Sequence, residues 1–274
     1  MAMYKIALTA AAVLILSACG GGGGSSSPNT DSTEKPGPNQ SSLSNVPTAY
    51  QSAVKQAKDF APYEDSDLIY TQLTIDGKTV RHDEKIDFSS LKDGFSDKKV
   101  TLNYQDDSGR KGNAEATMKI YQQPYSMVIG TLVTKDSLNL SETGRLSIDH
   151  VRGLTTTEQG LPTTGTFTYN GVAFSDKEQG TLSYNVDFDA RTGSGAISGL
   201  NTYGQITLAK GHINKAMNQD MVGMGIMGQM SASKQPNGGG FYELGFFGPN
   251  AEEIAGAAYY GDIVNTEIGF AGKR

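Results

Sequence analysis

Hydrophobic and polar residues alternate in several short stretches of the second half of the chain. Residues 182–188 read LSYNVDF and residues 241–246 read FYELGF. In both stretches, every even-numbered position holds a large hydrophobic side chain. A period of two places alternate side chains on opposite faces of a β-strand. Such a regular series of short strands predicts an antiparallel barrel, closed or nearly closed, whose interior is filled by side chains. Further strands are expected in residues 167–174, 193–200, 205–213 and 222–233.

The residues that follow this last alternating stretch predict how the barrel ends. The sequence GPN at residues 248–250 stops the strand, and residues 251–254 are expected to form one helical turn. Glu252 and Glu253 would then lie in the first turn as a solvated acidic cap, at the positive end of the peptide dipoles. A second strand follows, with the small residues GAA at positions 256–258, where large side chains would not fit.

The first half of the chain combines a helix with strands. Residues 48–59 are expected to form a short helix with Thr48 as its N-cap. An Asp-Gly pair in the middle of residues 73–80 is the signal of a tight hairpin. The chain therefore predicts an all-β fold with a minor helix, divided into an N-terminal β-rich domain at residues 45–143 and a C-terminal β-barrel at residues 144–274. Further strands are expected in residues 100–104, 114–122 and 126–134.

The beginning of the chain carries the features of an export signal. Lys5 precedes an apolar run at residues 6–16, which is too short to span a bilayer, and the sequence LSAC then ends in Cys19, the single cysteine. This arrangement resembles the bacterial lipobox, in which an acylated cysteine becomes the mature N-terminus; an ordinary secretory leader is the alternative. We expect residues 1–18 to be a lipoprotein signal peptide and Cys19 to carry the lipid. Residues 19–44, rich in Gly, Ser and Pro, are expected to form a disordered tether.

Three separated motifs carry a resemblance to a known family. Residues 161–200 contain YNGVAF, GTLSYNVDF and GSGAI; residues 241–260 read FYELGFFGPNAEEIAGAAYY; and the chain closes on IGFAGKR. In this order and spacing the motifs resemble the bacterial factor H-binding protein and transferrin-binding protein B lipoproteins. A weaker resemblance covers residues 78–143, including AEATMKIYQQ and SMVIGTLVT. The resemblance implies that the C-terminal barrel has eight antiparallel strands.

The resemblance also implies a non-enzymatic binding function at the cell surface. Members of the family are lipidated outer-membrane proteins, exported by a surface lipoprotein assembly modulator, and they bind complement factor H, transferrin or haem. For this chain it implies a monomeric, surface-exposed outer-membrane lipoprotein that binds a host serum protein such as factor H in immune evasion. Haem or iron acquisition is the alternative. The acidic contact positions of the family correspond here to Gly238 and Tyr259, so the identity of the ligand is left open.

Candidate contact residues are the aromatic and polar side chains near the end of the barrel. We expect them on the barrel exterior or in the groove between the domains, and they are Phe241, Glu243, Tyr259 and Tyr260. Under the haem alternative, the candidate ligands are His82, His150 and His212. An ordinary exposed or packed histidine is the simpler interpretation of each, because they lie far apart in the sequence with no zinc or nucleophile motif around them.

Composition and motifs exclude other classes of function. A formal net charge of −6 argues against a nucleic acid partner, whose phosphates would be repelled. No catalytic motif is recognisable in the sequence, so we expect no enzyme activity, no metal and, outside the haem alternative, no cofactor. Methionines recur between residues 217 and 230, but glycines interrupt a helix there. As a strand, one face would hold Val222, Met224, Ile226 and Met230, which favours core packing over a soft ligand pocket.

Overall fold

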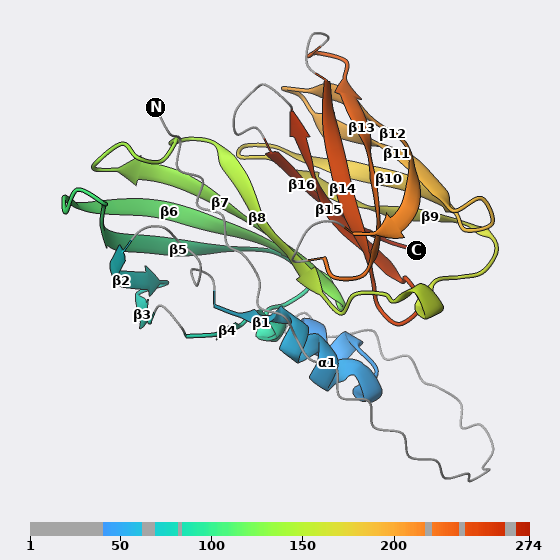
Figure 1. The fold of residues 1–274 in the computed structure, drawn as a ribbon, viewed down its shortest axis with the longest axis horizontal. Helices are drawn as coiled ribbons and strands as arrows, with labels where there is room; N and C mark the ends of the chain where they lie inside the picture. Colours follow the sequence, from blue (N-terminus) through green and yellow to red (C-terminus); the bar gives the residue numbers. More distant parts are fainter. Residues whose placement is uncertain (1–40, 62–68, 82–83, 217–220, 236–238, 261–266) are drawn as a thin grey trace.

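The computed structural model describes residues 41–61, 69–81, 84–216, 221–235, 239–260 and 267–274 (Figure 1). Within these residues the chain forms a six-stranded sheet, a closed barrel and a short helix packed beside both. The all-β fold with a minor helix is confirmed. Several predictions concern residues outside the described ranges: the signal peptide, Cys19, most of the tether, His82 and Gly238.

The barrel consists of eight antiparallel strands, as predicted. Each strand pairs with the next one in the sequence, and β16 (Glu267–Lys273) pairs with β9 (Thr166–Phe174), which closes the ring. Because the strands pair in sequential order, short alternating stretches at regular spacing were sufficient to predict the barrel. The other barrel strands are β10 (Gln179–Asp187), β11 (Thr192–Leu200), β12 (Gly204–Lys215), β13 (Met224–Ala232), β14 (Gly239–Phe247) and β15 (Glu253–Tyr260).

Side chains fill the barrel interior. Tyr184 of β10 and Tyr242 of β14 meet across it, with 2.8 Å between their hydroxyl oxygens. Glycines make room for both rings: a Cβ atom at Gly193 would lie 2.7 Å from the ring of Tyr184, and one at Gly228 would lie 2.6 Å from the ring of Tyr242. The alternation of large and small inward residues therefore gives a packed core.

The helical turn predicted for residues 251–254 is wrong. Residues 248–251 form a tight turn in which Gly248 has a φ of 91° and Ala251 a φ of 59°, values that no right-handed helix contains. The hydroxyl of Tyr169 donates to the Ala251 carbonyl at 2.6 Å and holds the turn against the barrel. Strand β15 consequently begins at Glu253, and this carboxylate is buried instead of forming a solvated cap.

The N-terminal half contains an antiparallel sheet with the strand order β3-β2-β5-β6-β7-β8. The hairpin between its first strands is the predicted one, because Asp76 and Gly77 both have positive φ, 48° and 80°. One face of the sheet carries a core of its own, with Leu102, Ile120 and Ile129. The strands are β2 (Ile69–Ile75), β3 (Lys78–Val80), β5 (Gly94–Gln105), β6 (Lys111–Gln122), β7 (Ser126–Asp136) and β8 (Leu146–Gly153).

The boundary expected between residues 143 and 144 falls inside this sheet. Strands β7 and β8 lie on either side of it and pair with each other, and the barrel begins at Thr166. The polar stretch before residue 146 is a hairpin loop, not a linker. Asp136 organises it by accepting hydrogen bonds from the backbone N–H groups of Leu138 and Ser141, at 3.1 and 2.8 Å.

The folded part of the chain begins earlier than predicted, and the N-cap of the first helix is a different residue. Helix α1 (Thr48–Lys58) has Pro47 at its N-cap, and no side chain caps it, so Thr48 is not the cap. A 3-10 turn, η1 (Ser42–Asn45), lies where the tether was expected to continue; the buried Ser42 hydroxyl donates to the Gln123 carbonyl at 2.8 Å. The remaining short elements are β1 (Asp59–Phe60), β4 (Ile86–Asp87), η2 (Phe88–Ser90) and η3 (Glu158–Gly160).

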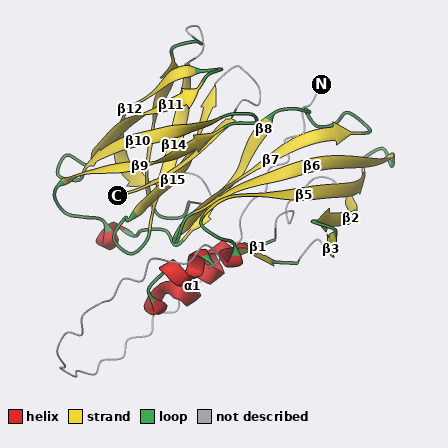
Figure 2. Ribbon diagram, turned by 180° about the vertical axis from the view of Figure 1, so that it is seen from behind, coloured by secondary structure: helices red, strands yellow, loops and turns green. Residues whose placement is uncertain are grey.

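The second face of the sheet packs against the outside of the barrel (Figure 2). On the barrel side the contact is made of small residues of β15 and β16, among them Ala255, Ala257 and Ala271. Larger side chains of β7 and β8, such as Val128 and Ile148, fill the space. Of the small GAA stretch noted in the sequence, Ala257 faces the sheet and lets it approach closely, whereas Ala258 packs in the barrel core. Helix α1 contributes to this region too; among the described residues, no helix has the length and apolar content needed to cross a membrane.

One loop, residues 123–126, joins helix, sheet and barrel. From α1, the buried ammonium of Lys58 donates to the carbonyl oxygens of Gln123 at 2.5 Å and Pro124 at 2.9 Å. From β15, the carboxylate of Glu253 accepts hydrogen bonds from the Tyr125 N–H at 3.1 Å and the Ser126 hydroxyl at 2.8 Å. We call this arrangement the junction clamp. It fixes the sheet relative to the barrel through buried, charge-assisted hydrogen bonds.

Candidate functional site

The outer wall of the barrel carries a stacked aromatic pair, of which one ring is exposed and the other is half-buried. Phe241 of β14 lies directly opposite Tyr259 of β15, and their rings stack with centroids 5.0 Å apart and an interplanar angle of 29°. Phe241 remains 45% exposed, which is unusual for a phenylalanine. We define the aromatic patch as Met227, Phe241, Glu243 and Tyr259. Three of these residues were predicted as ligand-binding candidates, and the structure brings them together.

Strand alternation decides which candidates reach this surface. Tyr242 points into the barrel core, so Phe241 and Glu243 on either side of it point outward. For the same reason Tyr260 points inward when Tyr259 points outward. Tyr260 is buried in the core and stacks on Tyr203, with centroids 5.8 Å apart. The predicted candidate Tyr260 is therefore not part of the aromatic patch.

Met227 is a member of the patch that sequence reasoning missed. It pairs with Glu243 across β13 and β14 and is 43% exposed. The methionine run was predicted to be core packing, and Met224 and Met230 do lie in the barrel core. Val222, expected on the same face, precedes the strand and is exposed. Strand alternation could have identified Met227, because it lies between the inward-facing residues Ile226 and Gly228 and must therefore face outward.

Negative charge surrounds the aromatic pair. Burial raises the pKa of the Tyr259 hydroxyl, and the carboxylates of Glu267, Glu243 and Asp149 raise it further. Glu267 lies opposite Tyr259 on β16 and accepts a hydrogen bond from the Ile148 N–H of the sheet. The patch thus lies at the edge where sheet and barrel meet, with a neutral phenol beside carboxylates. The surface itself presents Phe241, the edge of Tyr259 and Met227, whereas the Glu243 side chain is buried close to them.

The junction clamp behind this surface has perturbed acid–base behaviour. Burial raises the pKa of Glu253 to about 7, although the Ser126 and Tyr125 hydrogen bonds and the Lys58 charge oppose this shift. Burial also lowers the pKa of Lys58 to about 8, against the opposing influence of Glu253 and Asp93. Both shifts have the same cause, because a charge loses its hydration when it is buried. Both charged side chains are nevertheless buried and hydrogen-bonded to the loop, so we assign the clamp a structural role.

The two histidines within the described residues, His150 and His212, do not converge. His150 is buried on β8, where it pairs with Ile129 of β7, whereas His212 is exposed on β12 of the barrel. They therefore belong to different sheets. Among the described residues, no group of three or more His, Cys, Asp or Glu side chains is arranged to hold a metal ion.

Comparison with known proteins gives one family match, which covers much of the barrel. Residues 159–258 match the family described as "Factor H binding protein, C-terminal". The match begins at η3 and ends in β15, and it contains Met227, Phe241 and Glu243. Tyr259 is the next residue along the chain.

Solved structures with a similar chain path include transferrin-binding proteins. Intact Ap-TbpB, with its N and C lobes, is 15% identical, with 77% of this chain and 42% of that chain covered and a TM-score of 0.46. Transferrin-binding protein B of Haemophilus parasuis Hp5 is 17% identical, with 77% and 41% covered and a TM-score of 0.43. A protein described as a surface lipoprotein is 16% identical, with 57% and 80% covered and a TM-score of 0.40.

The chain spans less than half of the length of the two transferrin-binding proteins. The evidence for similarity to a known family is therefore the family match. It agrees with the resemblance found in the strand motifs of residues 161–200 and 241–260. The barrel region at residues 159–258 is thus similar to the factor H binding protein C-terminal family.

Proposed function

We propose that this protein is a non-enzymatic, lipid-anchored outer-membrane protein that is exposed on the cell surface and binds a host protein through its aromatic patch. The observation that carries the proposal is the stacked pair on the barrel wall at the edge of the sheet, in which the Phe241 ring is exposed and rests on the half-buried ring of Tyr259. Exposed aromatic rings are energetically costly in water and are enriched at protein interfaces. The name of the matching family, a factor H binding protein, supports a protein ligand.

The patch has the composition expected of the centre of such an interface. Stacked aromatic rings lose little conformational entropy on binding, because each is already held by its neighbour. Met227 adds a flexible, exposed apolar side chain beside them, and the buried Glu243 adds negative charge close to the surface. A host protein that presents donors or cations around an apolar centre would complement this surface. Complement factor H is the first ligand to test, in a role of immune evasion.

Surface display rests on the beginning of the chain. Cys19 follows LSA at the end of an apolar run, and lipidation there would anchor the chain to the outer membrane. Residues 20–40 would then separate the lipid from the first folded residues, which allows the patch to reach a soluble partner. Export by a surface lipoprotein assembly modulator and a monomeric state complete the proposal.

Two measurements on intact cells test the proposal. Protease added outside should digest the protein, and Cys19→Ser should abolish its retention on the cell. Cells that display the wild-type protein should retain one serum protein from host serum, whereas cells that display Phe241→Ala at equal density should not. Resistance to external protease would overturn surface display. Equal serum binding by wild type and Phe241→Ala would overturn the role of the patch.

A further inference from the structure

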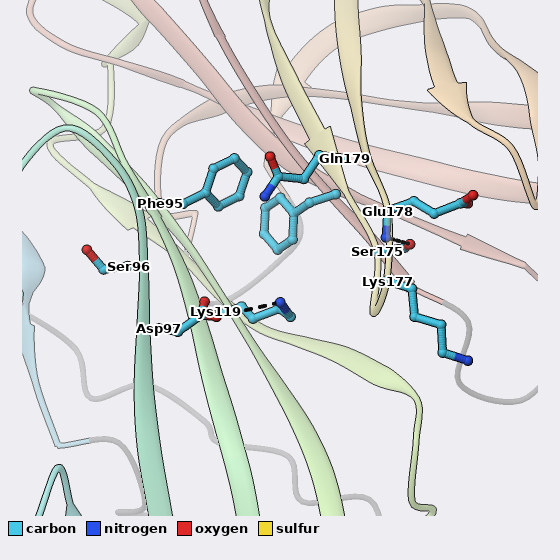
Figure 3. Close-up of a pocket in the computed structure, with 9 residues that line it drawn as sticks. Phe95, Ser96, Asp97, Lys119, Ser175, Lys177, Glu178 and Gln179 are labelled. Carbon is cyan, nitrogen blue, oxygen red and sulfur yellow. Dashed lines mark hydrogen bonds and ion pairs between the residues drawn. The ribbon is translucent and has the colours of Figure 1, made fainter.

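A pocket opens between the sheet and the barrel, formed by residues that the proposed function does not use (Figure 3). Its volume is about 320 Å³, at the lower end of the range typical of small-molecule sites. Strands β5 and β6 form one wall, and the β9–β10 hairpin forms the other. The lining residues used below are Phe95, Asp97 and Lys119 of the sheet and Phe174, Lys177, Glu178 and Gln179 of the barrel side.

Phe95 supplies an aromatic wall that is already fixed in position. It is 37% exposed, although its ring makes edge contacts with Tyr121 at 4.8 Å and with Phe174 at 5.4 Å between centroids. Because two neighbours hold the ring, a ligand that packs on it would not have to order it. Figure 3 places Phe95 and Gln179 on facing sides of the pocket.

The charged groups around the pocket are already compensated. Lys119 forms an ion pair with Asp97 at 3.8 Å, and Lys177 forms one with Asp176 at 3.6 Å. Glu178 accepts a hydrogen bond from the Thr202 N–H at 3.0 Å, and Figure 3 shows its side chain directed away from Phe95. An anionic ligand would compete with Asp97 for Lys119, and a cationic ligand would compete with Lys119 for Asp97. A wholly apolar ligand would cover these polar groups without satisfying them.

A neutral ligand rich in hydroxyl groups would not compete for Lys119 or Asp97 with a charge of its own, and it would not leave the polar groups of the pocket without hydrogen bonds. Each hydroxyl both donates and accepts, so it can bond to the Asp97 carboxylate, the Lys119 ammonium and the Gln179 amide without a net charge. The C–H face of a sugar ring can pack on the aromatic ring of Phe95. We propose that the junction pocket binds a neutral saccharide of one or two rings. This inference rests on the pocket alone and does not depend on the proposed function.

Titration of the purified protein with saccharides, followed by ligand-observed NMR, tests the inference. The probes are lactose, N-acetyllactosamine, maltose and chitobiose, with N-acetylneuraminic acid and glucuronic acid as charged counterparts. We expect at least one neutral disaccharide to bind and Phe95→Ala to weaken its binding at least fivefold. Tyr50→Ala, which removes an exposed aromatic ring of α1 outside the pocket lining, is the matched control and should bind as the wild type does.

A second variant separates a loss of binding from a loss of folding. Gln179 is exposed at the first position of β10, so Gln179→Ala should leave the thermal midpoint unchanged and still weaken binding at least threefold. The same glycan offered free and on a carrier protein distinguishes a free sugar from a glycoprotein as its source; binding of either supports the inference. Binding of no neutral probe, binding of the charged probes alone, or binding unchanged in both pocket variants would overturn it.

Discussion

Lys58 and Glu253 both bind the loop at residues 123–126, Lys58 through backbone carbonyl groups and Glu253 through a backbone N–H group. The Lys58 ammonium donates to the loop carbonyls of Gln123 and Pro124, whereas the Glu253 carboxylate accepts from the N–H group of Tyr125. The loop is therefore held from α1 on one side and from the barrel on the other. Because all these groups are buried, either side chain alone would leave an uncompensated charge and unpaired loop atoms.

Removal of the Lys58 charge should destabilise the fold. Lys58→Met keeps the length of the side chain but leaves the Glu253 carboxylate without its buried counter-charge and two carbonyls without a donor. We expect the free energy of unfolding in urea to fall by about 3 kcal/mol. Lys55→Met on the same helix is the control; its exposed ion pair with Asp87 should matter by less than about 1 kcal/mol. Equal losses from the two substitutions would contradict the clamp.

Stability should depend on pH through Glu253. Its pKa is raised from 4.5 to about 7 in the folded protein, so the folded state binds this proton more tightly than the unfolded state does. The resulting contribution is fully present below pH 4.5 and is lost as the pH rises toward 7. The groups that face this carboxylate are Lys58, Asp93, Ser126 and Tyr125.

Glu253→Gln isolates this contribution from that of other carboxylates. The amide oxygen still accepts from the loop but does not titrate. The free energy of unfolding of the wild type minus that of Glu253→Gln should therefore decrease between pH 4.5 and pH 7. Urea titrations of both proteins at several pH values measure the difference. A difference that increases over this interval would mean that the Glu253 pKa is lowered, not raised.

Close packing of sheet on barrel should make Gly269 intolerant of a side chain. A Cβ atom there would lie 2.5 Å from the ring of Phe174 and 3.0 Å from the Cδ1 atom of Ile148. We expect Gly269→Ala to lower the free energy of unfolding by about 1–3 kcal/mol. Gly239→Ala is the control, because nothing lies within 4 Å of its Cβ position. If thermal unfolding showed both variants to be equally stable, the contact between β16 and β8 would be looser than described.

The barrel could be predicted from the sequence because its strands pair in sequential order. Alternation in residues 182–188 and 241–246 specified both the strands and their inward residues, including Tyr184 and Tyr242. The Asp76-Gly77 hairpin was predictable for the same local reason. The turn at residues 248–251 was not, since a pair of glutamates suggests a helix start and the positive φ of Ala251 depends on a tertiary hydrogen bond from Tyr169.

The site could be predicted in part. Phe241 and Tyr259 lie 18 positions apart, and a hairpin register places them side by side. Strand alternation would have excluded Tyr260 from the aromatic patch, because Tyr259 faces outward and the next residue must then face the barrel core. The junction clamp and the pocket had no local signal: Lys58 and Glu253, like Phe95 and Gln179, come from elements that only the packing of sheet on barrel brings together.

The affinity of the captured host protein for patch variants tests the central claim most directly. Phe241→Ala removes the exposed ring of the stacked pair, which should cost roughly 2 kcal/mol of binding, or about thirtyfold in Kd. Tyr50→Ala, an exposed aromatic residue on α1, should leave Kd unchanged. Surface plasmon resonance with the wild type and both variants gives the three values. A Kd that rises for Phe241→Ala alone supports the aromatic patch as the contact surface, whereas equal Kd values for all three proteins would contradict it.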